Sequence, residues 1–335
     1  MKKNLIFYSS VSDLSLFNTQ QFYQTDIKLL QELGYNVILS NKVVDAFKFW
    51  TYDVVFGYFF RYSFFFILIA KLFGRNSYLT GGIDALDINL VGKKEYMKQR
   101  VFFILCFWIA KKCIIVSETD LQHVEAIVGK ETDKIVYSEH SIDTLAFLYN
   151  INNKQNNFVT IGWMGTISNV KRKGIDKALY LFARLKQQSE YTDSMFFIIG
   201  RKGEGTPYLE KLIKEYKLEN SVVITGEVTE EKKIDYLKNN KYYFQLSIFE
   251  GFGVAALEAL IAGCVIIHSG KGGLSNSIYN RHIFVDIDKE LDSQINSIIY
   301  LLKNVNYEEL CRQSRQCGEY YDNKRRFDDF KKIIR

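Results

Sequence analysis

Two glutamates flank a glycine-rich turn in the segment EGFGVAALE, residues 250–258. The apolar run at 242–247 predicts a strand before this turn, and a helix is predicted to begin at Val254. Backbone N–H groups at the start of a helix bind anions, and the helix dipole strengthens this binding. A diphosphate over the glycines would leave Glu250 and Glu258 to accept hydroxyl groups at opposite ends of one ligand. The alternative is an ordinary strand–helix turn with solvated glutamates, because such a turn alone has low specificity.

Short apolar runs rich in β-branched and aromatic residues alternate with helix-length segments along the chain. The runs that predict strands are 5–10, 36–41, 53–59, 77–82, 113–118 and 134–139, then 158–165, 195–200, 222–228, 242–247, 264–269 and 282–287. Strands that are apolar throughout and are joined by helices form parallel sheets covered on both faces. The 335 residues therefore predict an α/β chain of two doubly wound, Rossmann-like domains.

The segment NINNKQNN at 150–157 is polar, lacks apolar periodicity and is predicted to link the two domains. Residues 1–150 are then the N-terminal domain, and residues 158–318 the C-terminal domain. Residues 319–335 are predicted to form a C-terminal helix that packs back on the N-terminal domain. Ligands of such sheets bind beyond the carboxyl ends of the strands, so function is expected in those loops.

Further motifs accompany the glycine-rich turn, and together they resemble a known family. EALIAGCVII and GKGGL follow the E-x7-E pattern, and the motifs before it are GWMGTISNVKRKGID (162–176), the two βα units of 196–238, IIVSETD (114–120) and EHSIDT (139–144). This order resembles the retaining glycosyltransferases of family 4, closely over 158–278 and loosely over 1–145. The resemblance implies a GT-B fold, in which two Rossmann-like domains face each other across a cleft. It also implies that a nucleotide sugar is the donor.

The resemblance assigns roles to residues of the C-terminal domain. In that family the residue matching Glu258 holds the nucleotide ribose, and the one matching Glu250 contacts hydroxyl groups of the donor sugar. Lys173 matches the lysine that neutralises the leaving diphosphate, and stabilising this developing charge is the main catalytic task. The remaining donor-binding residues implied by the resemblance are Gly165, Thr166, Arg172, Gly251, Phe252, Gly253 and Val254.

The sequence departs from the family pattern at Thr166, where the family usually has an arginine. Lys171 or Arg172 can supply the missing charge, or can lie in a solvated loop. Gly272 and Gly273 match the family's glycine pair after the fifth strand, although Ser275 replaces the usual proline.

The N-terminal domain departs more. Family members often carry a histidine after the fourth strand, and none of the four histidines of this chain lies there. Thr80-Gly81-Gly82-Ile83-Asp84 occupies that place, so Asp84 is a candidate for a sugar contact or for the base toward the acceptor, or else a turn former. The acceptor side would include Gly81 and Gly82. Gln20, in the loop after the first strand, is predicted to bind acceptor or phosphate.

Composition excludes several other classes of function. The net charge of +6 is mild and is not gathered into a nucleic-acid footprint, so no nucleic-acid partner is expected. The five cysteines include no CxxC pair, which is typical of a reducing cytoplasm and offers no cysteine metal site. Asp286-Ile287-Asp288 matches a metal-binding DxD only superficially and is interpreted as a helix cap. We expect no required metal and no cofactor besides the donor substrate.

A basic and aromatic segment at 93–112 has two interpretations. Lys93, Lys94, Lys98, Arg100, Lys111 and Lys112 surround the apolar run 101–110, which contains Phe102, Phe103, Phe107 and Trp108. The helix can rest on anionic lipid, where a lipid-linked acceptor would be presented. It can equally be a buried helix with charged ends, which its nearly continuous apolar character favours. The run is shorter than the ~20 residues of a membrane span. The predicted location is the cytoplasm, at the inner face of the cell membrane under the first interpretation.

The functional hypothesis is a retaining, metal-independent hexosyltransferase that acts on a glycan or lipid-linked glycan in polysaccharide biosynthesis. Two alternatives stay open. A non-catalytic nucleotide-sugar-binding subunit is suggested by Thr166 and by the absent histidine. A nucleotide-sugar 2-epimerase on the same scaffold would need acid and base groups beside the second carbon of the sugar, which the EGFG-x4-E pattern fits less well.

Overall fold

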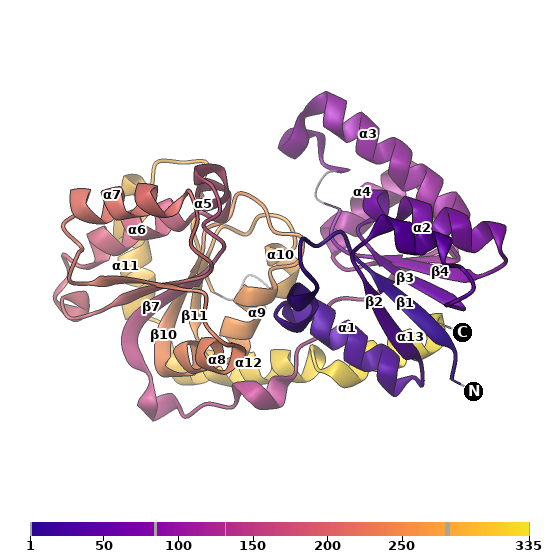
Figure 1. The fold of residues 1–335 in the computed structure, drawn as a ribbon. Helices are drawn as coiled ribbons and strands as arrows, with labels where there is room; N and C mark the ends of the chain where they lie inside the picture. Colours follow the sequence, from indigo (N-terminus) through magenta and orange to yellow (C-terminus); the bar gives the residue numbers. More distant parts are fainter. Residues whose placement is uncertain (1, 84–85, 131, 279–281, 335) are drawn as a thin grey trace. The chain divides into compact units, whose positions relative to one another are not determined.

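The computed structural model describes residues 2–83, 86–130, 132–278 and 282–334. The chain divides into two compact units, one made of residues 1–143 and 321–335 and the other of residues 144–320. Each unit is built on one six-stranded parallel sheet with helices packed on it (Figure 1). The predicted α/β class with two Rossmann-like sheets is confirmed.

The sheet of the first unit has the strand order β2-β1-β3-β4-β5-β6. Its strands are β1 (Asn4–Tyr8), β2 (Asn36–Ser40), β3 (Val54–Tyr58), β4 (Asn76–Thr80), β5 (Lys112–Ile115) and β6 (Ile135–Tyr137). Successive residues of a strand point to opposite faces, so Leu5 and Phe7 enter one core and Ile6 and Tyr8 enter the other. Both faces of this sheet are therefore apolar and need covering.

Helices cover both faces of the first sheet. The face of Leu5 and Phe7 is covered by α1 (Gln21–Glu32) and α13 (Asn323–Ile333). The opposite face is covered by the 3-10 helix η2 (Val43–Phe47) and by α2 (Phe60–Leu72), α3 (Ile88–Ile109) and α4 (Glu118–Val128), and Figure 1 shows these helices across the sheet from α1. We call η2, α2, α3 and α4 the outer helical layer of this unit.

The C-terminal helix α13 is fastened to the first unit by a buried ion pair. Arg326 and Asp26, on α1, are both fully buried. The Arg326 guanidinium donates from Nε to Asp26 Oδ1 at 2.6 Å and from Nη2 to Oδ2 at 2.8 Å. Its Nη1 donates to the carbonyl oxygens of Ser138 at 2.7 Å and Glu139 at 2.8 Å. A buried charge needs such partners, and they hold the C-terminal helix against the N-terminal sheet, as the sequence predicted.

The second unit contains a sheet with the strand order β12-β11-β10-β7-β8-β9. The strands are β7 (Gln155–Ile161), β8 (Phe196–Ile199), β9 (Val222–Gly226), β10 (Asn240–Gln245), β11 (Val265–His268) and β12 (Ile283–Phe284). The helices are α5 (Ile167–Lys173), α6 (Ile175–Leu185), α7 (Thr206–Glu215), α8 (Glu230–Asn239), α9 (Val254–Ile261), α10 (Leu274–Ser277), α11 (Ile295–Lys303) and α12 (Tyr307–Tyr320). The loops after β7, β8, β10 and β11 leave the same edge of the sheet because all these strands are parallel.

The predicted boundaries differ from the structure at two places. The polar segment 150–157 is not simply a linker, because β7 begins at Gln155 and the boundary between the units falls at 143–144. Its asparagines looked unstructured in sequence, yet Asn157 donates to Asn240 Oδ1 at 3.0 Å and accepts from the Met195 N–H at 2.8 Å. Paired amides thus replace the apolar pattern at the start of this strand.

The second difference lies near the C-terminus. The helix predicted over 319–335 is interrupted, since α12 ends at Tyr320 and α13 begins at Asn323. Asp322 takes an extended conformation and its side chain accepts from the Lys324 N–H, which caps α13. The chain passes from the second unit to the first at this break.

Candidate active site

The glycine-rich turn after β10 has a conformation that requires glycine. Gly253 is the residue before α9 and has φ 83°, in the left-handed region. A Cβ at this position would lie 2.6 Å from Leu274 Cδ2. Any larger residue would therefore be strained and would push α10 away from the turn. The first N–H groups of α9 follow directly, as the sequence predicted.

A second glycine pair packs its backbone on this turn. Gly273 donates its N–H to the Glu250 carbonyl at 2.7 Å, and Gly272 has φ 62°. A Cβ at Gly272 would lie 2.3 Å from the Glu250 carbonyl oxygen, and one at Gly273 would lie 2.3 Å from that of Gly251. The GKGGL motif thus occurs with EGFG because the two loops are in direct backbone contact.

Lys173 is delivered to the same place by the end of α5. Gly174 follows it with φ 66°, and a Cβ there would lie 2.0 Å from the Leu246 carbonyl oxygen. The Ile248 N–H donates to the Arg172 carbonyl at 2.8 Å. The Lys-Gly pair of the sequence motif therefore docks on the carboxyl end of β10, immediately before the glycine-rich turn.

Glu250 is the centre of a buried polar cluster. Its Oε1 lies 2.6 Å from Lys173 Nζ and accepts from Ser247 Oγ at 2.7 Å and from Gln245 Nε2 at 2.9 Å. Burial would raise the pKa of Glu250, but the charge and hydrogen bond of Lys173 and the bond from Ser247 outweigh it and hold this pKa below its usual range. Glu250 is therefore a carboxylate at neutral pH, fixed in direction and able to accept further hydroxyl groups.

Glu258, on α9, makes a second buried ion pair. Lys233 Nζ, on α8, lies 2.9 Å from Glu258 Oε1 and 2.8 Å from Oε2, and also 2.8 Å from Glu230 Oε1. Burial raises the pKa of Glu258, and Lys233 offsets this only in part. Burial would lower the pKa of Lys233, but the two neighbouring carboxylates outweigh it and raise that pKa. Lys233 thus holds the carboxylate for which the resemblance implied a ribose contact.

The loops after β7 and β8 add positive charge at this edge of the sheet. A Cβ at Gly203 would lie 2.8 Å from Gly165 Cα, so the two loops touch through glycines. The Thr166 hydroxyl bonds to Asn169 in the N-cap of α5, so its side chain has a structural task. The Arg201 guanidinium lies 5.0 Å from the ring centre of Trp163. Arg201 is therefore a further candidate, besides Arg172, for the charge that Thr166 lacks.

The structure places other predicted residues outside this cluster. In the first unit Gly81 follows β4 with φ 111°, and a Cβ there would lie 3.2 Å from the Phe59 nitrogen. Gln20 is exposed at the start of α1 and makes no side-chain cap bond there. Asp84 lies outside the described residues. The acceptor-side assignments of Gln20, Gly81 and Gly82 stay predictions.

Asp286 and Asp288 pair with lysines. Asp286 lies 3.0 Å from Lys289 Nζ, Asp288 forms an ion pair with Lys271, and the Asp288 N–H bonds to Asp286. Among the described residues no group of three or more His, Cys, Asp and Glu side chains could hold a metal ion. His268, at the end of β11, is buried, and burial lowers its pKa to about 4, so it is neutral at pH 7.

Sequence reasoning missed four residues of this region. Gln245 and Ser247 lie at the polar end of an otherwise apolar strand, and that polarity was a usable signal. Arg201 follows β8 directly, at a strand end where ligands bind, so its position was informative. Lys233 had no signal, because it stands among other charged residues on a predicted helix.

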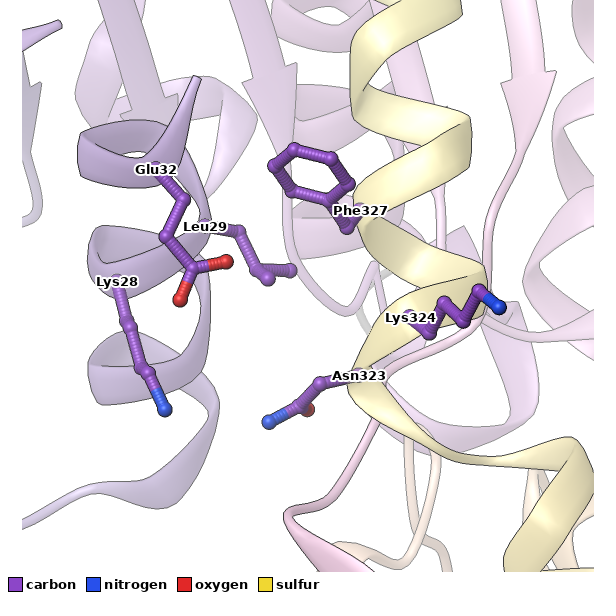
Figure 2. Close-up of a pocket in the computed structure, with 6 residues that line it drawn as sticks. All are labelled: Lys28, Leu29, Glu32, Asn323, Lys324 and Phe327. Carbon is purple, nitrogen blue, oxygen red and sulfur yellow. The ribbon is translucent and has the colours of Figure 1, made fainter. Parts of the chain in front are cut away.

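Two cavities lie elsewhere in the fold. One, of about 270 Å³, is between α1 and α13, where Leu29 and Phe327 point toward one another (Figure 2). The other, of about 430 Å³, is lined by Tyr180, Tyr208 and Tyr216. No residue of the predicted donor site lines either cavity, so the chemistry of the strand-end loops, rather than hollow volume, identifies the candidate site.

A comparison with known families bears directly on this arrangement. Residues 142–320 match the model of the glycosyl transferases group 1, and this match covers more than half of the chain. The chain belongs to this family. The matched residues include the whole glycine-rich cluster described above. The family membership therefore accounts for the joint presence of Lys173, Glu250 and Glu258.

Sequence relatives of this glycosyltransferase come from distant organisms. Protein CapJ of Staphylococcus aureus is 26% identical over 208 residues, which are 62% of this chain and 48% of CapJ. A chain of the phosphatidylinositol N-acetylglucosaminyltransferase of Arabidopsis thaliana is 21% identical over 241 residues, 70% of this chain and 53% of that protein. The chain spans about half the length of these relatives.

Solved structures share its fold. Sucrose-phosphate synthase from Thermosynechococcus elongatus has a TM-score of 0.77 at 14% identity, covering 99% of this chain and 98% of that chain. Anabaena HepE in complex with UDP-glucose has a TM-score of 0.75 at 14% identity, with 99% of each chain covered. Identities this low show the fold alone, and they confirm the predicted GT-B fold.

Proposed function

We propose that this chain transfers a hexose from a nucleoside-diphosphate sugar to a glycan or lipid-linked glycan, with retention of configuration. The observation that carries the proposal is the Lys173–Glu250 pair at the glycine-rich turn, with a 2.6 Å contact. A cation and a carboxylate side by side match the two ends of such a donor, because the diphosphate is anionic and the sugar carries hydroxyl groups.

The proposed roles follow from position. Glu258 accepts the ribose hydroxyls, and Glu250 accepts hydroxyls of the donor sugar. The N–H groups at the start of α9, together with Gly251, Phe252, Gly253 and Val254, line the diphosphate and the sugar. Lys173, aided by Arg172 or Arg201, supplies the positive charge that stabilises the diphosphate as it leaves. In this proposal side chains supply that charge, and no metal ion or cofactor is required.

The proposed reaction exchanges one bond at the anomeric carbon. The bond from this carbon to the diphosphate oxygen breaks and its electron pair leaves with the diphosphate. The acceptor oxygen attacks from the same face and forms the new glycosidic bond. Its proton passes to an oxygen of the departing phosphate. Front-face attack gives retention without a covalent intermediate on the protein.

Donor binding would rearrange the ion pair. Lys173 and Glu250 now neutralise each other, with Oε1 as the shared oxygen. A bound diphosphate competes for the ammonium group, while a sugar hydroxyl donates to the carboxylate. Each side chain would thus exchange one partner for another of the same charge type, which keeps both groups solvated by polar contacts during binding.

The setting we propose is polysaccharide biosynthesis on the cytoplasmic side of a membrane. Support comes from the S. aureus relative, Protein CapJ, and from the A. thaliana relative, whose name refers to a phosphatidylinositol N-acetylglucosaminyltransferase. The five cysteines are free and buried, which suits a reducing compartment. Because the chain spans about half of each relative, the acceptor is proposed from chemistry and not carried over.

A transfer assay tests this function against its alternatives. Purified protein is incubated with a panel of nucleotide sugars, with and without glycan acceptors, and the nucleotide product is measured. We expect release of nucleoside diphosphate that depends on acceptor and is abolished by Glu250→Ala with the fold intact. Release of an epimerised nucleotide sugar without acceptor would indicate the 2-epimerase. Binding of a donor without any turnover would indicate the non-catalytic binding protein.

A further inference from the structure

The outer helical layer of the first unit exposes large apolar side chains. Trp50 and Leu72 are each 69% exposed and Trp108 is 68% exposed, and Phe65, Val101 and Leu105 are also exposed. We call these six residues the apolar face. Exposed apolar clusters of this kind mark contact with a protein or with a membrane.

On α3 the exposed residues form a stripe. Val101, Leu105 and Trp108 are spaced four and three residues apart, so they share one side of the helix. Phe103 and Cys106, on the other side, are buried in the core. The run 101–110 is therefore not fully buried, as its continuous apolar character favoured, but presents a second apolar side to solvent.

The neighbouring helix continues the same surface. On α2, Phe65 and Leu72 are seven residues apart and share a side of that helix. The two helices are in contact through Phe60 and Phe103, with ring centres 5.1 Å apart (Figure 1). Trp50 joins the end of α2 through Phe49, which it meets edge-on at 5.2 Å.

Charge is strongly divided along this unit. Residues 42–112, which contain the apolar face, carry eleven Lys or Arg against five Asp or Glu. The following residues, 113–150, carry two against seven. Lys93, Lys94 and Lys98 are exposed on α3 directly before the stripe. The apolar face thus has a cationic surround, which the mild charge of the whole chain conceals.

We propose that the apolar face docks on an anionic lipid bilayer. Trp50, Phe65 and Trp108 would lie among the headgroups, and the lysines would contact anionic lipid phosphates. Two copies of the chain joined through this face would oppose their positive charges, so a second copy fits less well. No helix in the described residues is long and apolar enough to cross a membrane, so the contact is a docking on the surface. The inference adds a partner to the proposed function but does not depend on it.

Vesicle flotation of the full chain tests this docking, with no nucleotide present. We expect binding to vesicles of phosphatidylcholine with 30% phosphatidylglycerol, at least tenfold weaker binding to pure phosphatidylcholine, and loss of binding at high salt. Leu105→Glu on α3 is expected to lower the bound fraction at least tenfold. Leu301→Glu on α11 is the matched control, because both leucines are 42% exposed, and it should bind as the wild type does.

Tryptophan fluorescence gives an independent reading. The chain has three tryptophans, so a variant that keeps only Trp108 and a variant that keeps only Trp163 can be compared. The emission of Trp108 is expected to shift to shorter wavelength with anionic vesicles, whereas that of Trp163 should not move. Absence of flotation with both compositions, or equal loss in both leucine variants, would overturn the proposal. A wild-type dimer that Leu105→Glu dissociates, without vesicle binding, would assign the face to a second copy instead. Nucleotide binding by the second unit is measured separately, so either proposal can fail alone.

Discussion

The ammonium group of Lys173 lies 2.6 Å from Glu250 Oε1, and the two residues are 77 positions apart in the sequence. Two glycines make this contact possible. Gly174 lets the end of α5 approach the carboxyl end of β10, and Gly253 lets α9 begin right after the turn that holds Glu250. The pair is therefore a product of the backbone geometry at one edge of the sheet.

Replacement of Lys173 by alanine removes the charge proposed to stabilise the leaving diphosphate. Since loss of one group that stabilises a developing anion costs about 100- to 1,000-fold, Lys173→Ala should lower kcat/KM by about that factor. Lys173→Arg should recover part of the activity. Lys211→Ala, an exposed lysine on α7, is the control. Steady-state transfer kinetics check this, and full activity of Lys173→Ala would exclude the assigned role.

Lys233→Met is expected to make donor binding more sensitive to acid. Burial already raises the pKa of Glu258, and loss of the neighbouring ammonium raises this pKa further. The ionised carboxylate is the better acceptor of ribose hydroxyls, so KM for the donor should rise and kcat should change little. The acid limb of the kcat/KM profile should move to higher pH. Lys232→Met, an exposed neighbour, should keep the wild-type profile.

The same variant has a stability signature with a definite sign. A carboxyl group whose pKa is raised in the folded state favours folding below its unfolded pKa, and this contribution is lost as the pH rises through the folded value. Lys233→Met raises that folded value, so its Tm deficit should be larger at pH 8 than at pH 5. A deficit independent of pH would show that Lys233 acts only through packing.

Arg326→Met tests the attachment of α13. The variant leaves Asp26 buried without its cation, and breaking a buried pair in this way costs about 3–5 kcal/mol of unfolding free energy. Chemical denaturation of the first unit measures the cost. Lys324→Met, an exposed position on the same helix, should change it by less than about 0.5 kcal/mol. If the two variants are equally stable, the ion pair does not hold the helix.

Gly273→Ala should disrupt the glycine-rich turn without touching any charged group. Its Cβ would lie 2.3 Å from the Gly251 carbonyl oxygen, so the two loops must separate. Donor affinity is expected to fall at least tenfold. Gly318→Ala, in α12, is the control, because a Cβ there meets its nearest atoms at 3.5 Å. Isothermal titration with the donor measures both, and unchanged affinity in Gly273→Ala would separate the loop contact from donor binding.

Much of the fold was predictable from the sequence because its strands are fully buried. Each of the twelve predicted runs overlaps a strand of the structure, including short ones such as β12. The exception in extent was β7, whose first residues are polar and pair through amide side chains, as Asn157 does with Asn240. Side-chain pairing of this kind leaves no periodic pattern.

The candidate site was predictable only where the chemistry is local in sequence. Glu250 and its glycines form one short motif, so their geometry followed from strand, turn and helix. Lys233 was not predictable, because its contact with Glu258 depends on how α8 and α9 pack. The exposed stripe of α3 was also hidden, since a helix that is apolar all round does not reveal which side the sheet covers.

Thermal melting with a panel of nucleotides tests the central claim most directly. Wild-type protein and Glu258→Ala are titrated with nucleoside diphosphates and their sugars up to millimolar concentration. A ligand at 100 times its Kd stabilises the folded state by about 2.7 kcal/mol, so at least one nucleotide should raise the wild-type Tm by several degrees. Glu258→Ala should lose most of that rise. If no nucleotide or nucleotide sugar moves the wild-type transition, or if Glu258→Ala responds equally, the donor site is not where this structure indicates.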